Sequence, residues 1–129
     1  MAEGFSSYAA NAVLNAIGNA AAFSVATPYI QLHTGAPGSA GTSNVAGNAT
    51  RKSVSFGTAS AGAMTNDVAV SWTSGEVDTS EDYTHVSFWD ASTAGNFIGS
   101  GAMTANAVIT GDTFTIPVGE CDLSIPVAS

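Results

Sequence analysis

The sequence predicts a mainly β protein, an antiparallel β-sandwich or jelly-roll-like barrel of about eight short strands with one N-terminal helix. Three observations lead to this prediction. Apolar residues near the N-terminus recur every four residues, as on one face of a helix. From residue 29 onward they alternate with polar residues instead, as in half-buried strands. Turn-forming residues then recur about every 8–12 positions, and no change of composition divides the 129 residues, so we expect a single domain over 1–129.

The helix is expected over residues 5–17. Ser6 or Ser7 can cap it, since a serine oxygen accepts a free backbone N–H of the first turn, and Gly18 suits the position after the last turn. The apolar stripe of this helix consists of Phe5, Ala9, Val13 and Ile17. Its alanines make the helix thin, which would allow close packing against a sheet or a neighbouring subunit.

The β-sandwich is expected over residues 28–127. Its strands are predicted at 29–34, 51–56, 67–72, 83–89, 97–103, 107–110, 113–118 and 123–127. A long loop, residues 35–47, separates the first two, and loops of this length often carry interactions. Residues 91–96 predict a hairpin turn. Gly99 and Gly101 lie within one strand, where glycine often marks a bulge or a close backbone approach.

The composition excludes several classes of function. Ten carboxylates and two basic residues, Arg51 and Lys52, give a formal charge of −8 at pH 7. Binding to nucleic acid or to an anionic membrane requires clustered cations, so we expect neither. The weakly polar stretch 16–25 is too short to span a bilayer, and the N-terminus lacks the basic region of a signal peptide. The single Cys121 leaves no internal disulfide and no Cys-based zinc site.

Few residues suggest chemistry. Carboxylates gathered in one flexible loop could bind Ca²⁺, although the EF-hand spacing is missing and a solvated charged loop explains them as well. These calcium candidates are Glu76, Asp78, Glu81 and Asp82. His33 and His85 are the only histidines, and no G-x-S-x-G motif accompanies the many serines. We therefore expect no enzyme activity, no metal and no cofactor.

Trp89 is the aromatic residue with the most open role, because strand alternation places it opposite Phe88. It could belong to the core, to a contact between subunits or to a sugar-stacking platform. The candidate interface residues are Phe5, Val13 and Ile17 of the helix, Pro37 of the long loop, the pair Arg51 and Lys52, Trp89, and Leu123 and Ile125 near the C-terminus.

Several stretches carry a resemblance to a known family. They are the helix 5–17, the segments 29–38, 51–59 and 70–72, and most clearly Thr84–Ala91 and Gly111–Gly119. In this order the chain resembles a family of small virion structural proteins of tailed bacteriophages, mainly of actinobacteriophages. Members are described as tail-fibre-like, minor tail or minor capsid proteins. The resemblance covers nearly the whole chain and is a pattern of strands and turns rather than a catalytic signature.

The resemblance implies a non-enzymatic part of a phage particle, assembled in the host cytoplasm and present in many copies. Because a chain with two basic residues is not expected to lie against packaged DNA, we expect it on the outer surface of the virion. Its partners would be the major capsid or other virion proteins, and further copies of itself, for which we expect a trimer. The first placement is a head decoration or minor capsid protein. The alternatives are a tail or tail-fibre adhesin that binds host glycans, and a carbohydrate-binding module without a structural duty.

Overall fold

The computed structural model describes residues 4–129 and confirms a mainly β fold with one helix. In chain order the elements are β1 (Gly4–Phe5), α1 (Ser7–Gly18), β2 (Tyr29–His33), β3 (Lys52–Ser53), β4 (Ala63–Thr65), β5 (Val70–Trp72), β6 (Glu81–Trp89), β7 (Phe97–Val108), β8 (Phe114–Ile116) and β9 (Asp122–Ser124). No helix of this described part is long and apolar enough to cross a membrane.

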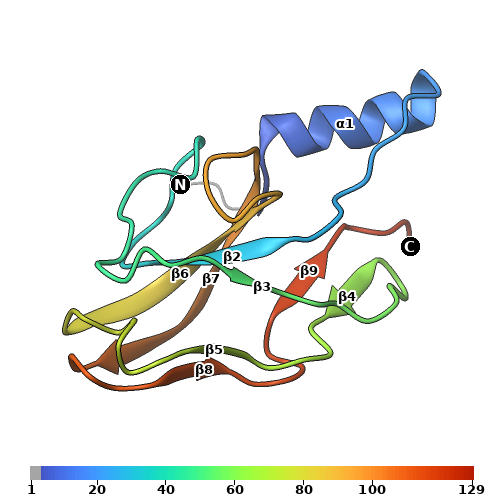
Figure 1. Ribbon diagram of the computed structural model, residues 1–129. Helices are drawn as coiled ribbons and strands as arrows, with labels where there is room; N and C mark the ends of the chain where they lie inside the picture. Colours follow the sequence, from blue (N-terminus) through green and yellow to red (C-terminus); the bar gives the residue numbers. More distant parts are fainter. Residues whose placement is uncertain (1–3) are drawn as a thin grey trace.

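The strands form one five-stranded sheet and two small ribbons (Figure 1). The sheet has the order β1-β7-β6-β2-β3, and the long β6–β7 hairpin lies at its centre. The ribbons β5–β8 and β4–β9 form the second layer, and every pair is antiparallel. The predicted sandwich-like architecture is therefore confirmed, with a second layer made of two separate ribbons.

The hydrophobic core lies between the sheet and the ribbons. Ile30 pairs with Phe88 and Leu32 with Val86, so these four side chains share the inner face of the sheet. Phe114 of β8 meets the core rings of Trp72 and Tyr83 at centroid distances of 5.7 and 5.0 Å. The fully buried apolar side chains of this core are those of Ile30, Leu32, Trp72, Val77 and Tyr83.

The outer face of the sheet is covered by the loop that follows β2. The loop folds back onto its own strand, because Thr34 N–H donates to Asn44 O at 2.9 Å and Ala46 N–H to Leu32 O at 3.1 Å. Residues 35–47 are thus a loop, as predicted, but an ordered one that buries the outer-face side chain of His33 completely.

The start of the helix differs from the prediction. Phe5 belongs to β1, Ser6 is the N-cap and α1 begins at Ser7. The reason is pairing, because Gly4 and Phe5 lie against Ser100 and Gly99 of β7. The helix ends at Gly18 with Asn19 as its C-cap, so Gly18 is helical rather than the residue beyond the helix.

Several strand boundaries also differ. β7 is one strand over 97–108 and joins two predicted strands, since the long β6 pairs with it as far as Val108. β3 keeps two residues of the predicted 51–56, and residues 125–127 lie outside β9. β4 was not expected, because Met64 is its one half-buried side chain and gives no alternation. The hairpin turn at 91–96 is confirmed, with positive φ at Ala94 and Gly95.

Candidate binding surfaces

The N-terminal helix is fixed to the sheet at its first turn only. Ser6 N–H donates to Ile98 O at 2.8 Å, the Ser6 hydroxyl donates to Phe97 O, and its oxygen accepts from Ala9 N–H at 3.1 Å. Beyond this point α1 leaves the sheet and projects from the body (Figure 1). Ala9 is its one buried residue. The anchored start therefore carries a largely solvent-exposed helix.

The arm, as we call residues 7–28, is α1 together with the segment that returns to β2. The two limbs touch through an edge-to-face contact of Tyr8 with Phe23, at a centroid distance of 6.3 Å. Leu14 is 64% exposed and Ile17 79% exposed, although the helical pattern would place both on a buried face. An isolated helix of 12 residues is marginal in water, so contacts with other groups would stabilise it.

The arm is also free of formal charge. Residues 4–50 contain no Asp, Glu, Lys or Arg, whereas every acidic residue other than Glu3 lies at position 67 or beyond. The exposed apolar side chains of the arm therefore belong to an uncharged part of a strongly acidic chain. The total charge of the chain does not reveal this separation of an uncharged arm from an acidic body, which appears only in the positions of the individual charged residues.

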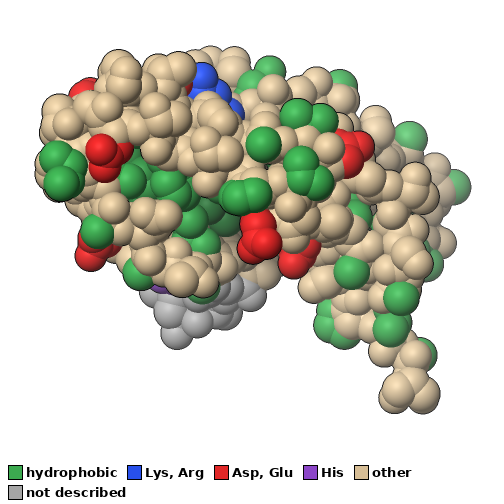
Figure 2. Space-filling view, turned by 90° about the horizontal axis from the view of Figure 1, so that it is seen from below, with side chains coloured by type: hydrophobic (Ala, Val, Ile, Leu, Met, Phe, Trp, Pro, Cys, Tyr) green, Lys and Arg blue, Asp and Glu red, His purple; other side chains and the backbone are tan. Residues whose placement is uncertain are grey.

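A second surface is a groove of about 650 Å³ between the edge of β7 and the ribbons. Its apolar wall includes Ile30, Val86 and Phe88 of the sheet, and Phe114 and Ile116 of β8 face them. Acidic Glu120 and Asp122 line the same groove. Figure 2, seen from below, shows a hollow lined by hydrophobic side chains with acidic side chains beside it.

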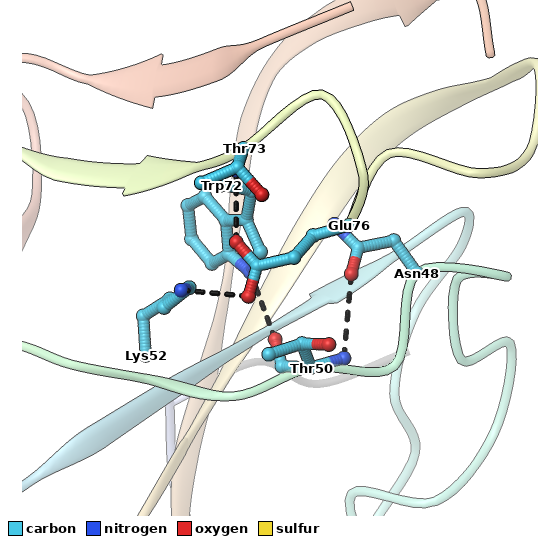
Figure 3. A network of polar contacts seen from close by, with 6 residues as sticks. All are labelled: Asn48, Thr50, Lys52, Trp72, Thr73 and Glu76. Atoms are coloured by element: carbon cyan, nitrogen blue, oxygen red, sulfur yellow. Dashed lines mark hydrogen bonds and ion pairs between the residues drawn. The ribbon is translucent and has the colours of Figure 1, made fainter. Parts of the chain in front are cut away.

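Both basic residues make contacts within the chain. Arg51 lies 3.9 Å from the centroid of the Trp89 ring, and its Nη1 donates to Ala91 O at 2.9 Å and to Ala94 O at 2.7 Å. Lys52 Nζ pairs with Glu76 Oε2 at 2.7 Å (Figure 3). These contacts attach the hairpin turn and the β5–β6 loop to the main sheet. That this pair also lies at an interface stays a prediction.

The network around this ion pair fixes the segment that precedes β3. Trp72 Nε1–H donates to Thr50 O at 2.8 Å, and Thr50 N–H donates to Asn48 Oδ1 at 3.4 Å (Figure 3). Thr73 N–H donates to Glu76 Oε1 at 2.8 Å. The hydrogen bond from Lys52, followed by that from Thr73, lowers the pKa of Glu76. The groups of this network bond to one another and to nearby backbone, so the network holds these segments together.

The calcium candidates do not come together. Glu76 is held by Lys52, and Glu81 accepts from the backbone N–H groups of Gly47 and Asn48 at 2.9 and 3.3 Å. Asp78 Oδ1 accepts from the Thr79 hydroxyl at 3.1 Å. Within residues 4–129 no three His, Cys, Asp or Glu side chains form a cluster suited to a metal ion. The carboxylates of Glu76 and Glu81 instead anchor neighbouring backbone.

His33 takes part in a buried hydrogen-bond chain. Its Nδ1 lies 2.9 Å from Ser43 O and its Nε2 2.7 Å from Ser87 Oγ, and both His33 and Ser87 are fully buried. Burial is the main cause that lowers the pKa of His33. Burial likewise raises the pKa of the free Cys121 thiol to about 11, so it stays protonated at neutral pH. Neither group is presented to solvent.

The remaining interface candidates differ in their exposure. Trp89 is 6% exposed and Pro37 is fully buried, so neither side chain is exposed, and Trp89 is buried on the outer face of the sheet. Val13 and Leu123 are half-buried. Phe5, Ile17 and Ile125 remain exposed, at 41%, 79% and 49%. The position of Trp89 depends on Arg51 lying over its ring, a long-range contact that strand alternation does not reveal.

The fold and these surfaces define a small, mainly β protein with an exposed apolar arm and an open groove. The family described as "Podophage GP4 fiber I protein gp80" matches residues 4–124, and the chain belongs to this family. It is thus a phage tail-fibre-like virion protein, as the resemblance indicated. No curated protein matches the chain. An origin in actinobacteriophages stays a prediction.

Proposed function

We propose that this chain is a non-enzymatic structural subunit of a virion fibre that packs against further copies of itself through the arm. The observation that carries the proposal is the exposure of Leu14 and Ile17 on an uncharged helix. Membership of a fibre family supports a fibre placement over the head decoration that we first expected. The trimer remains our expectation for the number of copies.

The energetics favour association of arms. Burying a Leu or Ile side chain contributes about 1.5–3 kcal/mol, so the exposed fractions of Leu14 and Ile17 leave about 2–4 kcal/mol per subunit to be gained. This gain is large for two side chains, and each contact between arms would add the burial of neighbouring alanines.

Electrostatics favour the arm as the place where copies meet. Two bodies of formal charge −8 repel each other, but a helix of 12 residues is about 18 Å long, which exceeds the screening length of about 10 Å in 0.1 M salt. Copies that meet through their arms would keep their acidic bodies apart. The same negative charge supports a position on the outside of the particle, away from packaged DNA.

The test is the oligomeric state of the purified chain by sedimentation velocity. We expect an oligomer for the unchanged chain and a monomer for the Leu14→Glu, Ile17→Glu double variant. Asn15→Glu is the matched control, because Asn15 is exposed on the opposite side of α1 and should leave the oligomer intact. Circular dichroism checks that each variant is folded. A monomeric unchanged chain, or a double variant that still associates, would contradict the proposal.

The adhesin and the carbohydrate-binding module are the alternatives to a structural subunit. The carbohydrate-binding module relied on Trp89 as a sugar-stacking ring, and this ring is buried under Arg51. The buried ring therefore gives this module no support. Binding of host cells or cell-wall glycans by the isolated chain would nevertheless establish an adhesin.

A further inference from the structure

We propose that the groove is a strand-addition site, which accepts an extended segment of a different virion protein. The segment would carry alternating apolar side chains and a Lys or Arg beside them. The identity of the partner as a virion protein depends on the proposed function. The site itself is inferred from strand edges, a glycine and the charges described below.

The first wall of the groove is the backbone edge of β7. Residues 99–104 all line it, so the groove follows the strand along its edge rather than touching one face. On this edge β1 pairs with Gly99 and Ser100, and no other strand of the described chain pairs there. On the opposite edge β6 pairs with β7 down to Val108. Within residues 4–129, the stretch of β7 backbone after Ser100 therefore has no strand partner on this edge.

The second wall consists of strands that, within the described part of the chain, also have a partner on one side only. Residues 114–117 and 120–124 line this wall, and they include β8 and β9. β8 pairs with β5, and β9 pairs with β4. An extended segment placed in the groove would thus lie between two incompletely paired edges. Unpaired edges of this kind bind added strands through main-chain hydrogen bonds, while pockets select their side chains.

Gly101 provides the space for an incoming side chain. It pairs with Val86, so a side chain at this position would point to the inner face of the sheet and into the groove. A Cβ built at Gly101 meets no atom of the described residues within 4 Å. At Gly99, by contrast, a Cβ would lie 2.7 Å from Gly4 O, so that glycine is required by the close approach of β1. No contact within residues 4–129 requires Gly101 to be a glycine, and a partner side chain would explain it.

The charges indicate what kind of segment fits. Exposed Glu120 and Asp122 line the groove, and no basic residue does. The chain has two basic residues, and both are engaged elsewhere, Arg51 with Trp89 and Lys52 with Glu76. A second copy would bring further carboxylates and no unengaged Lys or Arg to this site. A different polypeptide that carries a Lys or Arg is the complementary occupant.

The experiment is selection of a displayed random heptapeptide library on the purified chain. We expect enriched peptides that alternate apolar and polar residues and carry Lys or Arg. Gly101→Val should weaken their binding at least tenfold, because its side chain fills the groove without a clash. Gly75→Val adds the same side chain at an exposed loop position that is also free of neighbours within 4 Å, and should leave binding unchanged.

The charge of the groove is tested with the same peptides. The Glu120→Gln, Asp122→Asn variant should lose about two- to fivefold in affinity for each ion pair, an effect that added salt should mask. The proposal is overturned if no peptide is enriched, or if the enriched peptides bind Gly101→Val as well as the unchanged chain.

A second copy of the chain or a glycan in the groove would give a different experimental result, and either result would overturn the proposal. Loss of self-association in Gly101→Val would assign the groove to a second copy. Binding of cell-wall oligosaccharides that Gly101→Val abolishes would assign it to a glycan. Failure of the arm variants to dissociate the chain would refute the proposed packing function and leave the peptide result intact.

Discussion

Ser87 lies at the centre of a buried hydrogen-bond chain whose directions follow from its ends. Ser43 O can only accept, so His33 Nδ1 carries the proton and donates to it at 2.9 Å. His33 Nε2 must then accept, and the Ser87 hydroxyl donates to it at 2.7 Å. Trp89 Nε1–H donates to Ser87 Oγ at 2.8 Å. One hydroxyl therefore satisfies two ring groups of the outer face and links the covering loop to the sheet.

Ser87→Ala is expected to destabilise the protein by about 2–5 kcal/mol. The change leaves His33 Nε2 without a donor and Trp89 Nε1–H without an acceptor, and a buried polar group without its partner costs about 1–3 kcal/mol. Both rings are buried, with His33 at 0% and Trp89 at 6% exposure, so water cannot readily replace the hydroxyl. The loss would be a large part of an ordinary domain stability of about 5–15 kcal/mol.

Urea unfolding measures this loss, with Ser71→Ala as the control. Ser71 is also a strand serine whose hydroxyl contacts another hydroxyl, that of Thr115 at 2.9 Å, but the pair is exposed. We expect the control to change the free energy of unfolding by less than about 0.5 kcal/mol. A Ser87→Ala variant within that same limit would refute the hydrogen-bond directions and the argument from burial.

Two further predictions concern stability. Burial lowers the pKa of His33 in the folded protein below its ordinary 6.5. The unfolded chain therefore protonates His33 more readily than the folded protein does. The stability that comes from neutral His33 is complete above about pH 6.5 and is lost as the pH falls from there toward the lowered pKa. The midpoint of urea unfolding should therefore decline from pH 7.5 to pH 5. A smaller decline in the His33→Gln variant would show that His33 is the group responsible, whereas an equal decline in both proteins would contradict this assignment. Gly99→Ala should cost about 1–3 kcal/mol, because its Cβ would lie 2.7 Å from Gly4 O, whereas Gly101→Ala should cost less than Gly99→Ala. Equal thermal-unfolding midpoints for these two variants would show that β1 does not lie against Gly99.

Local patterns in the sequence predicted the elements whose side chains alternate clearly. Ile30 and Leu32 identified β2, and the N-cap Ser6 was one of the two serines predicted for that position. The joining of two predicted strands into β7 depends on its long-range pairing with β6, which the weak alternation around Gly101 does not reveal. β1 was missed for the same reason, since two residues form a strand there through their register with β7.

The candidate surfaces were harder to predict than the fold. Ile17 was expected in an apolar stripe that packs, and its exposure depends on α1 projecting beyond the sheet. Trp89 was left open because its burial needs Arg51, from a segment distant along the chain. The groove is defined by which strand edges stay unpaired, and this follows from the arrangement of the two ribbons rather than from any local motif.

The central claim is that this chain is a subunit of a virion fibre, and labelling of intact virions with an antibody against the chain tests it most directly. Electron microscopy should show the label on the fibres, in several copies per particle, in accordance with the family to which the chain belongs. Label spread over the head would contradict a fibre placement and restore the decoration hypothesis.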